Sequence, residues 1–228
     1  MRIIKIKNTM LVTILIFLIG ISFAASQDSL AGALELVRLK YAGGGDWYNG
    51  PSELPNLAEF VSKNASIPIY HRGKYVEPMS QELFNYPFLF MTGHGNVTFS
   101  NEEAARLRKY LMNGGFLFVN DDYELDKPFR RELKKVFPDK ELVELPFSHD
   151  IYHCFYNFPN GLPKIHEHDK KPAQGFGIFH DDRLVLFYAY EADIADGWDD
   201  PRVHNDPPEK REKALKMGTN IITYALTN

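Results

Sequence analysis

The fold is decided by the stretch YPFLFMTGHGNVTFSNEEAARLRKYLMNGGFLFVNDD, residues 86–122. Its segments 86–92 and 115–120 are continuous apolar runs, as expected of strands that are buried on both faces. Between them Ser100 opens the sequence S-N-E-E, a capping box in which Glu103 can reach back to the first turn of a helix. A strand, a helix and a strand with short joints predict a βαβ unit, in which the two strands lie parallel.

The rest of the chain continues this alternation of strands and helices. Apolar runs predict strands at 34–41 and 141–146, with a short one near 67–73, and the segment 175–190 predicts a hairpin that turns at His180, Asp181 and Asp182. Helical periodicity marks 55–65, 127–137 and 209–226, and a short helix is expected near 78–85. The pattern predicts an α/β three-layer sandwich, with a mainly parallel central sheet and helices on both faces.

The N-terminus has the pattern of a secretory signal peptide, residues 1–26. Three basic residues precede an uncharged apolar run, and small residues follow it before Gln27 and Asp28. We expect cleavage between Ala25 and Asp28, which leaves a single α/β domain at 27–228 and predicts a periplasmic or secreted protein. The alternative is an uncleaved anchor, because the apolar run approaches the length that spans a bilayer. Contact with a membrane is expected only through this segment, if it is retained.

Composition limits the partners. The 228 residues carry a net charge of −4, and removal of the signal peptide with its three positive charges takes this to −7. A net negative charge gives no basic footprint, so nucleic acid is not expected as a partner. The only cysteine, Cys154, lies among aromatic residues in YHCFYNF, which predicts a buried small side chain rather than a nucleophile. Neither G-x-S-x-G nor H-E-x-x-H is present.

Polar residues follow several predicted strands directly. Because ligands of open α/β sheets bind beyond the carboxyl ends of the strands, we expect these residues to gather at one edge. His94 stands between two glycines that allow a tight bend, so it would project into a cleft as a base, a metal ligand or a hydrogen-bond donor. The alternative is a turn in which His94 bonds a neighbouring carbonyl. The expected ligand-binding residues are Asp46, Trp47, Tyr48, Gly93, His94, Gly95, Asp121, Asp122, His149, Asp193 and Trp198.

Several acidic segments allow two interpretations each. Asp121 and Asp122 have the chemistry to bind a hard cation, or Asp122 caps the following helix. The segment EADIADGWDD, residues 191–200, lacks the spacing of an EF-hand, and HEHD, residues 166–169, is expected to be a solvated turn. These patterns assign no metal site and no cofactor.

Five blocks of the sequence resemble the domain of unknown function 4159 family over roughly residues 34–226. They are TGHG, FSNEEAARLRKYLMNGGFLFVNDD, LPFSHDIYHCFYNFPNGLP, RLVLFYAYEADIADGW and GTNIITYAL. The resemblance implies a class I glutamine amidotransferase-like, flavodoxin-like fold, and no assigned reaction. Those amidotransferases use a cysteine on a strand-to-helix turn, whereas here the strand at 115–120 leads into NDDYELD. The catalytic triad is therefore missing.

The sequence leaves three functions open. The leading interpretation is a non-catalytic exported module that binds a small polar ligand or an exported protein partner at the carboxyl edge of the sheet. Trp47, Tyr48 and Trp198 would then supply stacking surfaces. The second is a hydrolase, with or without the help of a metal ion, in which His94, Asp121, Asp122 and His149 converge. The third is a role in envelope assembly, in which the domain docks on other exported proteins.

Overall fold

A seven-stranded sheet forms the centre of the protein. The computed structural model describes residues 32–228, so the predicted signal peptide lies outside the described residues, and residues 35–228 form one compact unit. A separate two-stranded sheet consists of β1 (Leu34–Glu35) and β3 (Ile69–Tyr70). The order across the large sheet is β4 (Tyr75–Val76), β2 (Val37–Leu39), β5 (Phe88–Met91), β6 (Phe116–Asn120), β9 (Arg183–Tyr190), β8 (Gln174–His180) and β7 (Val143–Glu144).

The sheet is mainly parallel, as predicted. Strands β4, β2, β5, β6 and β9 run in one direction, while β8 is antiparallel to both of its neighbours, β9 and β7. The pairing of β5 with β6 runs from Phe88↔Phe116 to Met91↔Val119. All residues of these two strands are buried, which explains why the sequence is apolar at every position rather than at alternate ones. The predicted βαβ unit is confirmed.

The helix that joins these strands, α3 (Asn101–Met112), begins where the capping box predicts. The Ser100 hydroxyl accepts a hydrogen bond of 3.1 Å from the Glu103 amide, and the Glu103 carboxylate accepts one of 2.7 Å from the Ser100 amide. Two amides of the first turn are thereby satisfied without solvent. Ala104, Leu107 and Leu111 are buried, so the helix covers the sheet with the face that its periodicity predicts.

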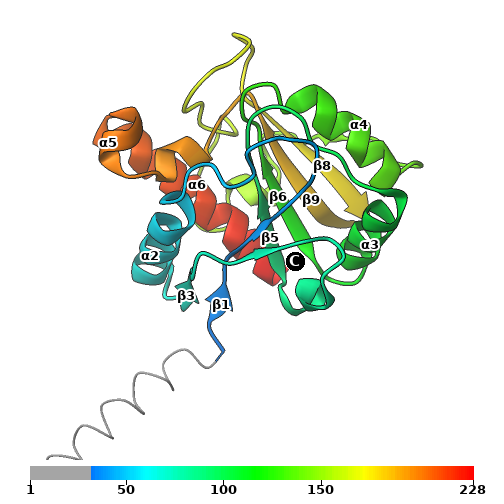
Figure 1. The fold of residues 1–228 in the computed structure, drawn as a ribbon. Coiled ribbons are helices and arrows are strands. Elements are labelled where there is room, and N and C mark those ends of the chain that lie inside the picture. Colours follow the sequence, from blue (N-terminus) through cyan, green and yellow to red (C-terminus); the bar gives the residue numbers. More distant parts are fainter. Residues whose placement is uncertain (1–31) are drawn as a thin grey trace, which may run out of the picture. The chain divides into compact units, whose positions relative to one another are not determined.

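Helices cover both faces of the sheet, as Figure 1 shows. One face packs against α3 and α4 (Asp126–Val136), and the other against α2 (Glu53–Ala65) and α6 (Pro208–Thr227). Alternating strand residues divide the core: Leu89 and Leu117 belong to the cluster that includes α3 and α4, while Phe90 and Phe118 contact the ring of Trp198. The remaining helical elements are η1 (Gln81–Asn85), η2 (Asp150–Tyr152), η3 (Ala195–Trp198) and α5 (Pro201–His204).

The hairpin of β8 and β9 turns at the predicted place. Asp181 and Asp182 have φ values of 48° and 63°, a left-handed pair that matches the twist of the two strands. The strand predicted at 141–146 is shorter than expected, since β7 has two residues and both are exposed. The strand predicted at 34–41 is divided into β1 and β2. Within residues 32–228, no helix has the length and apolar content needed to cross a membrane.

Candidate functional site

The order of the parallel strands reverses direction between β2 and β5. After β2 the chain adds β4 on one side of it, and then adds β5, β6 and β9 in turn on the other side. At such a point the loops that follow the two central strands diverge and leave a crevice at the carboxyl edge, where ligands of open α/β sheets bind. Asp46 follows β2, and His94 follows β5. Two residues expected at the site therefore lie at the reversal point.

His94 lies between two carboxylates. Its Nδ1 is 3.0 Å from Asp46 Oδ2, and its Nε2 is 2.8 Å from Asp122 Oδ1. The His94 backbone amide also donates to Asp46 Oδ1. The imidazole side chain is 45% exposed, so both nitrogens are fixed while one side of the ring remains open to solvent. The expected proximity of His94 and Asp122 is confirmed.

The two glycines beside His94 have different requirements. Gly93 has a φ of 129°, and a Cβ atom there would lie 2.4 Å from the Tyr41 hydroxyl and 2.9 Å from the Asp46 carbonyl carbon. Gly95 has a φ of 78°, and a Cβ atom there would meet nothing within 4 Å. The Gly95 amide donates to the Tyr123 carbonyl at 2.9 Å. Gly93 thus allows the close approach of two loops, and Gly95 allows the turn alone.

Asp122 is the buried member of this cluster. Its side chain is 4% exposed, and burial raises its pKa, while the nearby His94 opposes that shift. Oδ1 also accepts from the Tyr123 amide at 2.9 Å, and Oδ2 lies 3.4 Å from the Asn49 amide nitrogen. Helix α4 has no side-chain cap, so the alternative in which Asp122 caps this helix is not what the structure shows.

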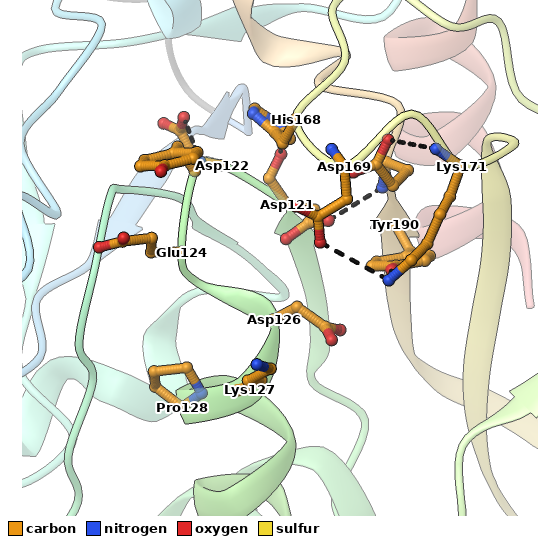
Figure 2. A pocket seen from close by; sticks show the side chains of 12 residues that line it. Asp121, Asp122, Glu124, Asp126, Lys127, Pro128, His168, Asp169, Lys171 and Tyr190 are labelled. Carbon is orange, nitrogen blue, oxygen red and sulfur yellow. Dashed lines mark hydrogen bonds and ion pairs between the residues drawn. The ribbon is translucent and has the colours of Figure 1, made fainter.

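Asp121 does not contact His94 and lies instead beside the start of the segment that follows β9. It accepts a hydrogen bond of 2.9 Å from the Glu191 amide, and burial raises its pKa to about 7. With Asp122 it lines a pocket of about 480 Å³, drawn in Figure 2. Acidic residues outnumber basic ones in the lining, which consists of Asp121, Asp122, Tyr123, Glu124, Asp126, Lys127, Pro128, His168, Asp169, Lys171, Tyr190 and Glu191. The pocket therefore favours a ligand that carries positive charge.

A buried ion pair holds the loop that carries Asp46. Arg38 of β2 lies 2.7 Å from the Glu53 carboxylate, and their side chains are 8% and 1% exposed. The same guanidinium donates to the carbonyls of Asn49 and Gly50. Arg38 thus fixes both the loop of residues 46–50 and the start of α2 with one planar group.

A search of family models matches residues 35–226 to a domain of unknown function, DUF4159. The chain belongs to the DUF4159 family. No curated protein has significant sequence similarity to the chain. The resemblance of the sequence blocks to this family is confirmed, and the DUF4159 match spans the whole sheet together with the cluster of Asp46, His94 and Asp122.

Sequence reasoning missed residues of this DUF4159 domain that lie at the carboxyl edge, among them His166 and His168. Asp193, which was expected at the site, is buried beside His168: Asn120 donates to its carboxylate at 2.9 Å, and His168 Nε2 lies 3.6 Å away. Burial raises the pKa of Asp193 well above its ordinary value. The expectation that HEHD is a solvated turn is wrong, because His166 and His168 both lie against carboxylates. The sequence did contain a signal for these contacts: two histidines in HEHD and four aspartates in the segment 191–200.

Two of the expected site residues lie elsewhere. Trp198 is 1% exposed and packs on Phe90 and Phe118, with its indole N–H donating to the Ala214 carbonyl, so it offers no stacking surface to a ligand. His149 packs on the rings of Tyr224 in α6 and Phe179 near the β8–β9 turn, and Tyr224 in turn contacts Phe116 at the start of β6, so His149 lies at the opposite edge of the sheet. After Leu145, whose amide donates to the Gly175 carbonyl, the chain turns back from the carboxyl edge, so the expected placement of His149 is wrong.

The remaining predicted residues agree in part with their expected roles. Tyr48 is 64% exposed beside the Asp46 loop, whereas Trp47 is half-buried against Tyr48 and Tyr75. Cys154 lies away from the site, where its thiol donates to the Asn220 carbonyl in α6 and burial raises its pKa to about 11. A thiol with that pKa is a poor nucleophile at neutral pH.

Proposed function

We propose that this DUF4159 domain is a non-catalytic, exported binding module, and that it holds a small polar ligand at the carboxyl edge of its sheet. The observation that carries the proposal is the cluster of Asp46, His94 and Asp122 at the point where the strand order reverses. A fixed imidazole, two carboxylates and an adjacent pocket offer several directional contacts to one ligand.

The fold proposed for the domain is flavodoxin-like, of the class I glutamine amidotransferase-like type. Numbered along the chain, the five parallel strands follow the order 2-1-3-4-5, which is the order of flavodoxin-like sheets. The site then corresponds to the switch point of that fold. The end of β6 presents Asn120, Asp121 and Asp122, and the only cysteine of the chain lies beside α6. This supports a binding role on that scaffold rather than glutaminase chemistry.

The ligand that fits best carries at least one amine. Acidic residues outnumber lysines in the lining of the pocket. An ammonium group of the ligand would reduce the repulsion between these carboxylates. Tyr123 is 53% exposed at the pocket, and Tyr48 is exposed beside the His94 loop. Exposed aromatic faces next to carboxylates suit an amino sugar or a similar hydroxylated amine, since rings stack and amines pair with the acids.

Export is part of the proposal and rests on the sequence of residues 1–26. N-terminal sequencing of the protein made in bacterial cells tests it. We expect a mature chain that begins between Ala25 and Asp28, recovered from the periplasm or the medium. Membrane-bound protein that retains Met1 would favour the uncleaved anchor instead.

Calorimetric titration with matched sugars tests the ligand class. Glucosamine and glucose differ by one amine, so the proposed site should bind the amine preferentially, and His94→Ala and Asp122→Asn should each weaken this binding by at least tenfold. His180→Ala, in the β8–β9 hairpin, is the matched control and should bind as the unmodified protein does. Equal binding of the two sugars, or binding that ignores both site variants, would refute the proposed ligand class.

A second candidate function is a hydrolase in which His94 activates a water molecule. The specific observation in its favour is that Asp46 contacts Nδ1 of His94, as in acid–histidine pairs of hydrolases. A water molecule would then take the place of Asp122 at Nε2 and give its proton to that nitrogen. A screen with ester, amide and glycoside substrates distinguishes the two functions. Turnover that is lost in both His94→Ala and Asp46→Asn would replace the binding proposal with the enzymatic one.

A further inference from the structure

A second cluster of histidines and carboxylates lies at the same edge, outside the pocket proposed for the ligand. It brings together three separate segments: His166 from the loop before β8, Asp196 from η3, and His204 from the end of α5. One donor atom from each of these residues lies within 4.8 Å of the others. Asp199 is adjacent, with its Oδ2 3.2 Å from His204 Nε2.

The spacing of these atoms is close to that of a metal site. His166 Nδ1 lies 2.5 Å from Asp196 Oδ2, and His204 Nε2 lies 3.6 Å from Asp196 Oδ1. Around an ion with bonds of about 2.0–2.2 Å, neighbouring donors of a tetrahedral site are about 3.3–3.6 Å apart. The distances from His204 Nε2 to Asp196 and Asp199 are already in or near this range. The distance between His166 Nδ1 and Asp196 Oδ2 would increase by roughly 1 Å when an ion binds.

The outer partner of His166 supports the same interpretation. Its Nε2 lies 3.0 Å from Asp206 Oδ2, and Asp206 is itself paired with Lys210 at 2.8 Å. A carboxylate that accepts from the far nitrogen fixes the tautomer of a histidine and directs its other nitrogen toward a metal. In the cluster, the nitrogen so directed is Nδ1, which faces Asp196.

Charge at the cluster also favours a cation. Asp193, Asp196 and Asp199 are largely or fully buried, and within residues 32–228 no lysine or arginine side chain pairs with their carboxylates. Their partners are histidines, amide and hydroxyl groups, as in the 2.5 Å contact of Ser52 with Asp199. Buried acids usually have a full positive charge beside them, and here the only groups in contact that can supply one are the histidines themselves. A bound cation would add the missing positive charge.

We propose that His166, Asp196 and His204 bind one divalent transition-metal ion, best fitted by Zn²⁺, with Asp199 in reach as the fourth ligand. Two imidazoles and one or two carboxylates form a set that Zn²⁺ accepts and that hard cations such as Mg²⁺ do not require. His166 lines a hollow of about 420 Å³ together with Lys164, Glu167 and Lys210, which gives the ion a path from solvent. The bound ion links the loop before β8, η3 and α5, and it does not depend on the ligand proposed above.

Calorimetric titration of the metal-stripped protein with ZnCl₂ tests the site directly, without any other ligand. We expect one equivalent of Zn²⁺ to bind far more tightly than Mg²⁺, and His204→Ala and His166→Asn each to weaken binding at least a hundredfold. Asp206→Asn should weaken it about tenfold, through the orientation of His166. Zn²⁺ at a hundredfold excess over Kd should also raise the Tm of the unmodified protein by about 5–10 °C.

Two controls separate this site from its neighbours. His180→Ala removes a histidine from the hairpin and should leave the Zn²⁺ titration unchanged, while His168→Ala tests the adjacent group of Asp122, His168 and Asp193. Visible absorption of the Co²⁺-loaded protein, together with a circular dichroism spectrum, distinguishes lost coordination from lost folding. Absence of stoichiometric Zn²⁺ binding would overturn the proposal. So would binding that survives in both His204→Ala and His166→Asn, or that is lost only in His168→Ala.

Discussion

The two edges of the parallel sheet differ in what they bury. At the amino edge, aromatic rings pack closely: Phe88 and Phe116 stack with centroids 6.1 Å apart, and Tyr224 of α6 lies 6.4 Å from Phe116. At the carboxyl edge, Asp122 and Asp193 are buried among polar groups. Apolar burial at the amino edge stabilises the folded state, whereas the burial of carboxylates at the carboxyl edge destabilises it.

This difference shows where the chain accepts a cost in stability. Burial raises the pKa of Asp121, Asp122 and Asp193, so each ionised carboxylate is less stable in the folded protein than in water. Strained or poorly solvated polar groups are common at functional sites, because a ligand relieves the cost when it binds. The binding role proposed above therefore falls on the edge that buries acids, while the amino edge contributes stability through apolar burial.

The largest expected effect is at the amino edge. Phe116→Ala removes a ring that is 1% exposed and should lower the free energy of unfolding by about 3–5 kcal/mol, because a cavity replaces its contacts. Tyr123→Ala removes an exposed aromatic ring at the carboxyl edge and should cost less than about 1 kcal/mol. Urea denaturation measures both. Equal losses in the two variants would show that the edges do not differ in this way.

The next effect compares the two glycines of the His94 loop. Gly93→Ala should lower the free energy of unfolding by roughly 2–4 kcal/mol, since the new Cβ atom meets the Tyr41 hydroxyl and the backbone of Asp46 at an unfavourable φ. Gly95→Ala has the unfavourable φ without the contact and should cost about 1 kcal/mol. The Tm values of the two variants, measured by thermal melts, test whether Gly93→Ala is the more destabilising. A Gly95 variant as unstable as the Gly93 variant would rule out the steric explanation.

A smaller effect, of opposite sign, is expected at Asp121. Its pKa is about 7 in the folded state against 3.8 ordinarily, so the folded protein binds the extra proton and loses stability as the pH rises from about 4 to 7. Asp121→Asn removes this loss and should be more stable than the unmodified protein by roughly 1–3 kcal/mol above pH 7, with no advantage near pH 4. Denaturation curves across this pH range measure the difference. A variant less stable at every pH would contradict the assigned burial cost.

The smallest effect on stability is expected at His94. His94→Ala should change the free energy of unfolding by less than about 1 kcal/mol, because the side chain is 45% exposed and supports little packing. The same variant should lose amine binding, which separates the two properties. A large fall in Tm with unchanged binding would instead show that His94 only supports its turn.

The backbone of the fold was predictable from local patterns. The capping box at Ser100 and the apolar runs that became β5 and β6 gave the βαβ unit, because each signal depends on residues close in sequence. The contact of His94 with Asp122 also followed, since parallel strands bring their following loops to one edge. These inferences needed only strand direction and position.

The positions of several other residues could not be predicted, because they depend on how irregular segments fold over the sheet. Trp198 follows β9 like a site residue, yet η3 turns it under α6, where apolar burial outweighs exposure to a ligand. The path of the chain after β7 takes His149 away from the site, and no local pattern shows that reversal. His166 and His204 meet through a loop and a short helix, so their approach was not visible in sequence spacing.

The outermost strands of the large sheet have a consequence for solubility at high concentration. Strands β4 and β7 contain two residues each, and Lys74 and Glu77 flank β4 on either side. A long unpaired strand would present a row of backbone amides and carbonyls to a second copy of the chain, and so would promote sheet-to-sheet aggregation. Strands this short present almost no such row, and the charges beside β4 discourage a neighbour further. If the protein is exported as proposed, it meets few chaperones after it folds, and its short outer strands then limit aggregation without their help.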